Sequence, residues 1–363
     1  MSKNIAQTDK NLAVTTVLEK DGISFYDVRR APFCLYGLYD AQNQPVFRRL
    51  PDNVATSVSE GVAFISMHTA GGRVRFSTDS EFICIKAKMN SIVPFAHMPG
   101  SNTWGFDMFA DSPEGSESRY VGTFMPPWNI TEDGYESRIN MNGKKSRYYT
   151  INFPSYCGVS ELFVGVSSDS SIGTGLDYRN IPPIVYYGSS ITQGGCASRP
   201  GNIYQNVVCR KTNIDYINLG FSGSAKGEDA IADYMATLNM SAFISAYDHN
   251  APSREHLKDT HFRLYEKIRA SHPDVPYIMI SKCDLDSEYD NALARRDVVY
   301  ESFYRARTNG DRNVYYIDGT SLFRGEYQNM CTVDLIHPND LGFALIANAV
   351  TGELQRAFTQ NAL

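Results

Sequence analysis

The chain has 363 residues, more than one hydrophobic core usually serves, so we expect two domains. Its formal net charge of −6, from 34 Lys and Arg against 40 Asp and Glu, argues against a nucleic-acid partner. No apolar run reaches the ~20 residues that span a bilayer, and the polar start has no apolar signal core. We therefore expect a cytoplasmic protein with no membrane partner. The seven scattered cysteines predict reduced, mostly buried thiols rather than disulfides or a zinc site.

The first half of the chain, residues 1–180, has the pattern of a β-domain. Short runs alternate apolar and polar side chains, and turn residues separate the runs. The pair Asn142-Gly143 lies between two such runs and predicts a hairpin. Many short strands with few helices predict a β-sandwich or jelly roll, which could bind carbohydrate. Strands are expected at 73–76, 82–89, 148–153 and 161–166.

The second half, residues 181–363, alternates strand-like and helix-like segments. The proline pair in Asn180–Pro183 favours an extended connection, so we place the domain boundary there. The alternation predicts a mostly parallel sheet with helices on both faces and ligands beyond the carboxyl ends of the strands. Expected strands are 184–187, 214–219, 242–247, 277–280 and 314–317, and expected helices are 204–211, 229–238, 254–270, 292–308 and 340–358.

A serine follows the first strand of this second half. In Gly188-Ser189-Ser190-Ile191, a tight turn would present the hydroxyl of Ser190 at the edge of the sheet. Backbone N–H groups at such a turn can stabilise an oxyanion. A serine-rich helix cap would explain the same residues, because a serine becomes a nucleophile only beside a positioned base.

Such a base occurs near the C-terminus, in Asp334-Leu335-Ile336-His337. A carboxylate three residues before an imidazole can hold one tautomer and stabilise the charged form. Taken alone, this pair is also common at the start of a helix. Together with Ser190 it predicts a serine hydrolase or an acyltransferase.

Two further loops follow the next strands. Gly223 could let its N–H approach a substrate oxygen, and Asn250 could donate its side-chain amide to an oxyanion. A plain glycine turn and a turn before a helix would explain each of them separately. Asp248 and His249 form a rival acid–base pair. The four elements occur in the order that the sheet needs, each at a strand end or in a loop, and their joint occurrence is what makes the pattern specific.

These blocks resemble the four signature blocks of the SGNH/GDSL hydrolase superfamily. The resemblance implies Ser190 as the nucleophile, His337 as the general base and Asp334 as the residue that orients it. It also implies an oxyanion hole of Ser190, Gly223 and Asn250, a flavodoxin-like three-layer α/β/α domain, and no metal or organic cofactor. Departures are Ser189, where the usual block has aspartate, and the third block, which reads Tyr-Asp-His-Asn instead of Gly-x-Asn-Asp.

The same blocks are similar to a two-domain subgroup with an N-terminal β-sandwich. That front domain often carries a Gly-x-Asp-Leu-Tyr motif, which is altered here to Gly105-Phe106-Asp107-Met108-Phe109. The resemblance covers nearly the whole chain and implies an acyl hydrolase. Related two-domain enzymes include carbohydrate O-acetylesterases and acyltransferases of natural-product assembly.

We expect a small-molecule or oligosaccharide ester as substrate, most of all an O-acetylated carbohydrate, because no long apolar segment suits a fatty chain. Aromatic side chains of the front domain could stack on a sugar or line the groove between domains, although core packing explains them equally well. The candidate substrate contacts are Gln193, Arg199, Tyr247, Asp248, Trp104 and Phe106, with Trp128 as a further aromatic.

Three alternatives and the assembly state stay open. An acyltransferase would use the same residues, and product analysis with and without an acceptor would separate it from a hydrolase. A non-catalytic carbohydrate-binding protein is disfavoured by the intact set of catalytic residue types. A metal hydrolase built on Asp248 and His249 lacks a two-histidine ligand spacing. The chain could also form a homo-oligomer.

Overall fold

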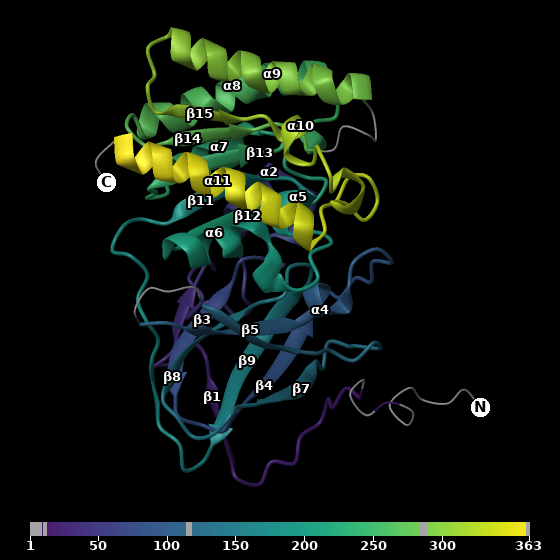
Figure 1. Cartoon of the computed structure of the whole chain (residues 1–363), viewed down its shortest axis with the longest axis vertical. Helices are drawn as coiled ribbons and strands as arrows, with labels where there is room; N and C mark the ends of the chain where they lie inside the picture. The colour runs from purple at the N-terminus through teal and green to yellow at the C-terminus, as the bar shows by residue number, and fades with distance from the viewer. Residues whose placement is uncertain (1–8, 10–12, 114–117, 284–288, 361–363) are drawn as a thin grey trace, which may run out of the picture.

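The structure is a computed structural model that describes residues 9, 13–113, 118–283 and 289–360. Two β-sheets packed face to face form one end of the molecule, and a five-stranded sheet covered by helices forms the other (Figure 1). The predicted combination of a β-sandwich with an α/β domain is confirmed. Among the described residues, no helix is long and apolar enough to cross a membrane.

Among the residues that the structure describes, the front domain contains ten strands in two antiparallel sheets. These are β1 (Ile23–Asp27), β2 (Cys34–Tyr36), β3 (Arg73–Thr78), β4 (Phe82–Asn90), β5 (Phe106–Asp111), β6 (Arg119–Phe124), β7 (Tyr135–Asn140), β8 (Arg147–Asn152), β9 (Gly158–Ser167) and β10 (Ile172–Thr174). One sheet has the order β1-β9-β4-β7 and the other β10-β3-β8-β5-β6, with β2 beside β3. Alternate side chains from both sheets, such as Phe76, Ile85 and Val164, point inward and form one core.

The turn at Asn142-Gly143 does not close a hairpin, so that prediction was wrong. Gly143 has φ +74°, as a tight turn requires. However, β7 pairs with β4, whereas β8 pairs with β3 and β5. The turn therefore carries the chain from one sheet of the sandwich to the other. The Asn-Gly pair allows the chain to reverse its direction here. The strand with which each flanking strand pairs depends on which side chains face the core.

The described part of the second domain contains five parallel strands and the helices that cover them. Its main elements are β11 (Ile184–Gly188), α5 (Ser190–Gln193), α6 (Tyr204–Thr212), β12 (Tyr216–Gly220), α7 (Asp229–Ala236), β13 (Ala242–Ala246), α8 (Arg254–Ser271), β14 (Tyr277–Ile280), α9 (Tyr289–Thr308), β15 (Val314–Ile317) and α11 (Asp340–Gln360). The strand order β12-β11-β13-β14-β15 is the flavodoxin-like order. Helices α6 and α11 pack on one face, and α7, α8 and α9 on the other (Figure 1).

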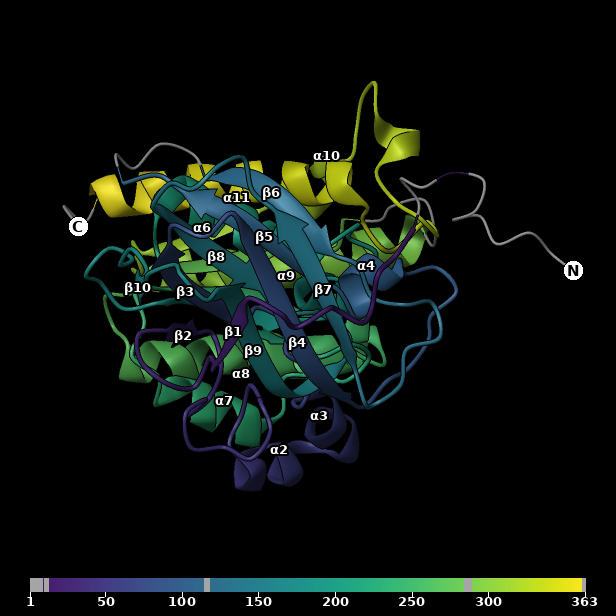
Figure 2. The same cartoon turned by 90° about the horizontal axis from the view of Figure 1, so that it is seen from below.

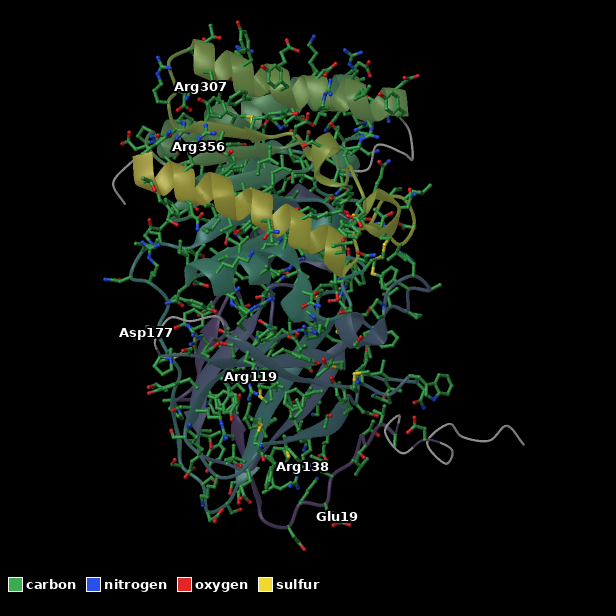
Figure 3. The ribbon with its side chains drawn as sticks, in the orientation of Figure 1. Glu19, Arg119, Arg138, Asp177, Arg307 and Arg356 are labelled. Carbon is green, nitrogen blue, oxygen red and sulfur yellow. The ribbon has the colours of Figure 1, made fainter. Side chains whose placement is uncertain are left out.

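The two domains are joined by a linker and by shared packing. Asp177 lies on the linker, at the level where the two halves of the molecule meet (Figure 3). Helices α2 (Asp52–Val58) and α3 (Glu60–Ile65) come from the first half of the chain, yet they lie beside α7 (Figure 2). Ala55 and Val62 belong to the same buried cluster as Ile231 of α7. The front domain thus completes one face of the α/β domain.

Candidate active site

The carboxyl ends of β11, β12 and β13 meet at one edge of the parallel sheet. Gly188 lies opposite Gly220 on one side and Ala246 on the other. The N–H of Phe221 donates to the carbonyl of Gly188 at 2.8 Å. The loops that follow these strands therefore begin side by side, where ligands of such sheets bind.

The two adjacent serines after β11 have different tasks. The Oγ of Ser189 accepts from the N–H of Ile191 at 3.2 Å and caps α5. The Oγ of Ser190 lies 2.9 Å from Nε2 of His337. A side chain at Gly188 would clash with Thr192 and the strand-end backbone, so only glycine permits this tight turn. From the sequence, the serine-rich turn could be either a helix cap or a nucleophile. In the structure it is both, because Ser189 caps the helix and Ser190 contacts His337.

His337 is held by the carboxylate that precedes it. Oδ2 of Asp334 lies 2.7 Å from Nδ1 of His337, and Oδ1 accepts from the N–H groups of Ile336 at 3.1 Å and His337 at 2.7 Å. Leu335 takes φ +68°, which folds the turn tightly enough for these contacts. Burial raises the pKa of the Asp334 carboxyl, but hydrogen bonds from the backbone and ring of His337, with its charge, outweigh burial and lower the pKa overall.

The expected oxyanion donors surround the same strand ends. In the parts of the chain that the structure describes, neither the N–H of Ser190 nor that of Gly223 donates to a protein acceptor. Gly223 has φ +67°, and a Cβ there would meet nothing within 4 Å, so its surroundings are open. Nδ2 of Asn250 donates to the carbonyl of Phe221 at 2.9 Å. One N–H of this amide therefore fastens the loop that carries Gly223.

The rival pair, Asp248 and His249, lies in the short helix η3 (Asp248–Asn250). Oδ1 of Asp248 is 3.4 Å from Nδ1 of His249, and Oδ2 accepts from the N–H of Lys282 at 2.7 Å. Asp248 is only 1% exposed. Its carboxylate therefore holds the loop after β14 in place, and this position argues against its predicted contact with substrate.

Gln193 has a bracing position instead of the expected substrate contact. It is fully buried, and its Nε2 lies 3.1 Å from both Nδ1 of His68 and the carbonyl of Ser155. Its Oε1 accepts from the N–H of Ser222 at 3.0 Å. Gln193 thus connects the front domain, through His68 and Ser155, to the loop that carries Gly223.

Three of the aromatic candidates also lie in packed positions. Phe106 is fully buried in the core of the sandwich, and Trp104 packs against the same core. Tyr247 is 1% exposed and shares a hydrogen bond with Thr260 at 2.9 Å. Their placement argues against the proposed sugar contacts for Phe106 and Tyr247. Trp128 is 89% exposed and keeps a free aromatic face.

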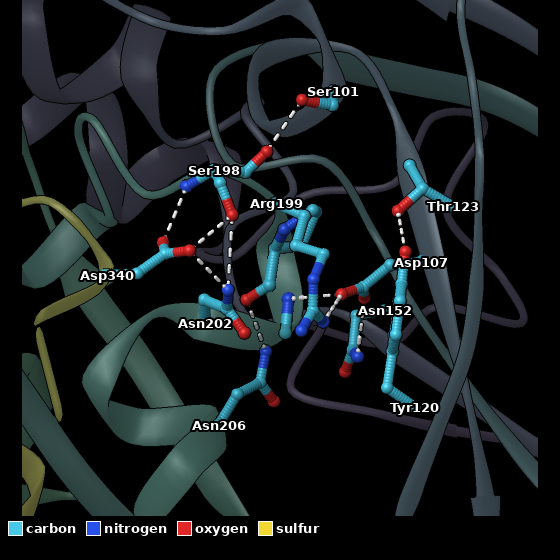
Figure 4. A network of polar contacts seen from close by, with 12 residues as sticks. Ser101, Asp107, Tyr120, Thr123, Asn152, Ser198, Arg199, Asn202, Asn206 and Asp340 are labelled. Carbon is cyan, nitrogen blue, oxygen red and sulfur yellow. Dashed lines mark hydrogen bonds and ion pairs between the residues drawn. The ribbon is translucent and has the colours of Figure 1, made fainter.

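Arg199 binds the altered motif of the front domain (Figure 4). Oδ2 of the fully buried Asp107 accepts from Nη1 of Arg199 at 2.8 Å and from the N–H of Gly201 at 2.9 Å. Its Oδ1 accepts from Nδ2 of Asn152 at 2.8 Å. The guanidinium of Arg199 also stacks on Tyr120, 3.8 Å from the ring centroid. Asp107 therefore anchors the segment that follows α5. Arg199, which was expected from the sequence to contact substrate, lies in this segment and binds Asp107.

Further front-domain residues, which the sequence did not single out, contact the nucleophile turn. The O–H of Tyr156 donates to the carbonyl of Ser190 at 3.0 Å. Nδ2 of Asn102 donates to the carbonyl of Gly194 at 2.9 Å. Neither residue lies in a pattern that marks a site, because each contact depends on how the two domains dock. The sandwich braces the turn that presents Ser190.

A second histidine reaches the site from the front domain. His97 lies on the loop between β4 and α4 (Gly100–Thr103), and its ring centroid is 5.5 Å from that of His337. Cys196 is buried nearby, in a backbone conformation with φ +69°. Burial, with a smaller contribution from Asp334, raises the pKa of the Cys196 thiol to about 12. No spacing or motif in the sequence predicts that these residues lie together.

Comparison with known families accounts for nearly all of the described chain. Residues 182–355 match the GDSL-like Lipase/Acylhydrolase family, and residues 23–172 match the GxDLY domain, the N-terminus of SGNH hydrolase-type esterases. The chain belongs to the SGNH/GDSL hydrolase superfamily. Within it, this SGNH hydrolase has the two-domain arrangement with a front β-domain, and it is a carboxylic ester hydrolase.

Solved structures share this two-domain fold. A candidate GDSL-like lipase from Bacteroides ovatus is 25% identical, with a TM-score of 0.83 over 93% of this chain and 98% of that one. A salicylyl-acyltransferase from a tetracycline biosynthetic pathway is 17% identical, with a TM-score of 0.72 over 93% and 98%. An acetyl xylan esterase from Butyrivibrio proteoclasticus is 12% identical, with a TM-score of 0.56 over 93% and 99%. No curated protein matches the chain significantly.

Proposed function

We propose that this SGNH hydrolase is a serine esterase that removes a short acyl group, most of all acetyl, from a carbohydrate. The observation that carries the proposal is the chain of contacts from Ser190 Oγ to His337 Nε2 at 2.9 Å and from His337 Nδ1 to Asp334 Oδ2 at 2.7 Å. This is the order of nucleophile, base and orienting carboxylate that acyl transfer to a serine requires.

In the proposed mechanism, His337 accepts the proton of Ser190 while Oγ attacks the ester carbonyl. Asp334 stabilises the imidazolium that forms, because its lowered pKa keeps the carboxylate ionised. The oxyanion receives hydrogen bonds from the N–H groups of Ser190 and Gly223 and from the Asn250 amide. Losing one such donor typically costs about 3 kcal/mol of barrier, on the order of 100-fold in rate.

The second half of the reaction reverses these proton movements. His337 gives its proton to the leaving alcohol, and an acyl-enzyme on Ser190 remains. Water then gives a proton to His337 and attacks the acyl carbon, which releases the acid and restores the Ser190 hydroxyl. An acceptor alcohol could replace water at this step, and the product would then be a new ester.

The crowded surroundings of Ser190 support a short acyl group. Ser190 is only 8% exposed, and Tyr156 hydrogen bonds to its carbonyl. Phe95 and Met98, from the front-domain loop, pack against Tyr156. These side chains cover the face of the nucleophile turn that meets the front domain. The carbohydrate part of the proposal is supported by the shared two-domain fold with an acetyl xylan esterase and by the exposed ring of Trp128.

The test is hydrolysis of p-nitrophenyl esters from acetate to octanoate, comparing the wild type with Ser190→Ala at matched folding. We expect turnover that is fastest with acetate and falls by at least about 1000-fold in Ser190→Ala. Acetylated xylan oligosaccharides follow, with released acetate as the readout. Equal activity of the two proteins would refute Ser190 as nucleophile, and transfer of the acyl group to an added alcohol without acetate release would indicate an acyltransferase.

A further inference from the structure

Two histidines and a cysteine converge beside Ser190. One potential ligand atom each from His97, Cys196 and His337 lies within 4.8 Å of the other two. The three residues come from the front-domain loop, the segment after α5, and the segment before α11. Only domain docking brings His97 to the other two, so no spacing in the sequence predicts this grouping.

Two imidazole nitrogens and a thiolate are the ligands that zinc prefers. Tetrahedral zinc with Zn–N of ~2.05 Å and Zn–S of ~2.3 Å places neighbouring ligand atoms about 3.3 to 3.6 Å apart. The observed separations of up to 4.8 Å therefore need a contraction of about 1 Å. Rotation of the His97 side chain on its loop can supply this movement, and water can complete the coordination.

The partner of His337 selects the nitrogen that would bind the metal. Nδ1 of His337 is engaged by Asp334, which leaves Nε2 as the ligand. A carboxylate on the far nitrogen is the usual partner of a zinc-bound histidine, because it fixes the tautomer and raises ligand basicity. Nε2 is also the atom that contacts Ser190 Oγ. A metal at this position would take the imidazole away from the serine.

We propose that His97, Cys196 and His337 form a binding site for a divalent zinc-like cation, and that its occupation reversibly blocks the esterase. On binding, a bond forms from the metal to the Cys196 sulfur, and the thiol proton leaves to solvent. Bonds from the two imidazoles replace metal-bound waters, and no electron is transferred. The proposed inhibition of the esterase rests on the proposed role of His337 as the general base, whereas the proposed metal binding does not.

Binding is measured first and without reference to activity. Cobalt(II) is added to the wild type, to Cys196→Ser and to Cys34→Ser, a control in which the replaced cysteine lies in the sandwich. A bound thiolate gives a near-ultraviolet charge-transfer absorption. We expect this band in the wild type and in Cys34→Ser, and its loss in Cys196→Ser. Absence of the band from the wild type, or its persistence in Cys196→Ser, would overturn the proposal.

Inhibition is measured next, as the zinc concentration that halves p-nitrophenyl acetate hydrolysis. Relative to each variant's own activity without zinc, Cys196→Ser and His97→Gln should each need at least about tenfold more zinc for half-inhibition, a difference of ~1.4 kcal/mol in binding. Chelator should restore the wild type. Equal zinc sensitivity of all variants would refute the site. If the wild type hydrolyses no ester, the proposed function fails, whereas the cobalt band still decides the metal site.

Discussion

The nucleophile turn shows how two identical side chains receive different tasks. Ser189 and Ser190 are adjacent, so their side chains leave the turn in different directions, one toward the start of α5 and the other toward His337. The sequence predicted a serine after the first strand of the second half, and an aspartate and a histidine together in one block near the C-terminus. It could not say which serine caps the helix, because this depends on the backbone angles of the turn.

The lowered pKa of Asp334 leads to a prediction about the acid side of the pH profile. Because the pKa of Asp334 is lowered, protonation of this carboxylate should add no loss of activity of its own on the acid side, so log kcat/KM should fall there with a slope no steeper than one. In Asp334→Asn we expect kcat/KM to fall by about 1000-fold or more, because the carboxylate no longer fixes the tautomer or stabilises the imidazolium. Stopped-flow assays between pH 4 and 9 would check both.

A slope of two on the acid side would contradict this prediction, since it would mean that a second essential group titrates together with the base. Asp79→Asn is a suitable control, because Asp79 is a carboxylate of the sandwich that accepts hydrogen bonds from Ser171 and touches no residue of the site. Its profile should overlay that of the wild type.

At the scale of elements, the parallel sheet was well predicted and the sandwich connections were not. Buried apolar runs bounded by turn residues marked all five strands from β11 to β15 to within two residues at each end. The turn between β7 and β8 was mispredicted because strand pairing in a sandwich depends on distant partners. Helices α2 and α3 were missed for a related reason, since their apolar side chains are buried against another domain.

The segment that follows α5 depends on one buried carboxylate of the front domain. Asp107→Asn leaves Arg199 without its ion-pair partner and the N–H of Gly201 with a weaker acceptor. Breaking a buried ion pair on one side costs about 3 kcal/mol or more. We expect a clear loss of stability in urea unfolding and a drop in kcat of about tenfold, because this segment leads directly from the nucleophile turn. Unchanged stability and kcat would contradict the bracing role.

At the scale of the whole molecule, residues on the two sides of the domain boundary in the sequence pack into one shared core. Buried Arg49, from the first half of the chain, donates through Nη1 to the carbonyls of Asn218 and Gly220 at the end of β12, at 2.9 and 2.7 Å. Leu50 and Val62 belong to the same core cluster as Phe221. The chain length predicted two domains, but it carries no information about contacts of this kind.

This shared packing predicts that the second domain does not fold well without the first. A fragment of residues 181–363 would expose the apolar face that α2 and α3 cover and would leave the β12 carbonyls without Arg49. We expect the fragment to be aggregated or molten, whereas residues 40–363 should retain helical circular dichroism with reduced stability. Gel filtration and near-ultraviolet circular dichroism would check this, and a cooperative, active 181–363 fragment would contradict it.

His68, which lies between the domains, predicts a loss of stability in mild acid. Burial, together with the nearby charge of Arg49, lowers the pKa of His68 to about 3, from an ordinary value of about 6.5. Below about pH 6.5, His68 therefore becomes protonated in the unfolded chain but stays neutral in the folded protein. Stability is retained above that value and is lost as the pH falls toward 3. Between pH 7 and pH 5 this histidine alone should remove about 2 kcal/mol.

The variant His68→Gln isolates that contribution. A glutamine can still accept the hydrogen bond that Gln193 donates to His68, but it does not titrate. The free energy of unfolding in urea should therefore fall by about 2 kcal/mol less in the variant than in the wild type when the pH is lowered from 7 to 5. His261, whose pKa burial lowers to about 4, remains in both proteins and cancels from the comparison. Equal losses in the two proteins would mean that His68 is protonated in the folded state, and the tight packing between the domains would then have to open around it.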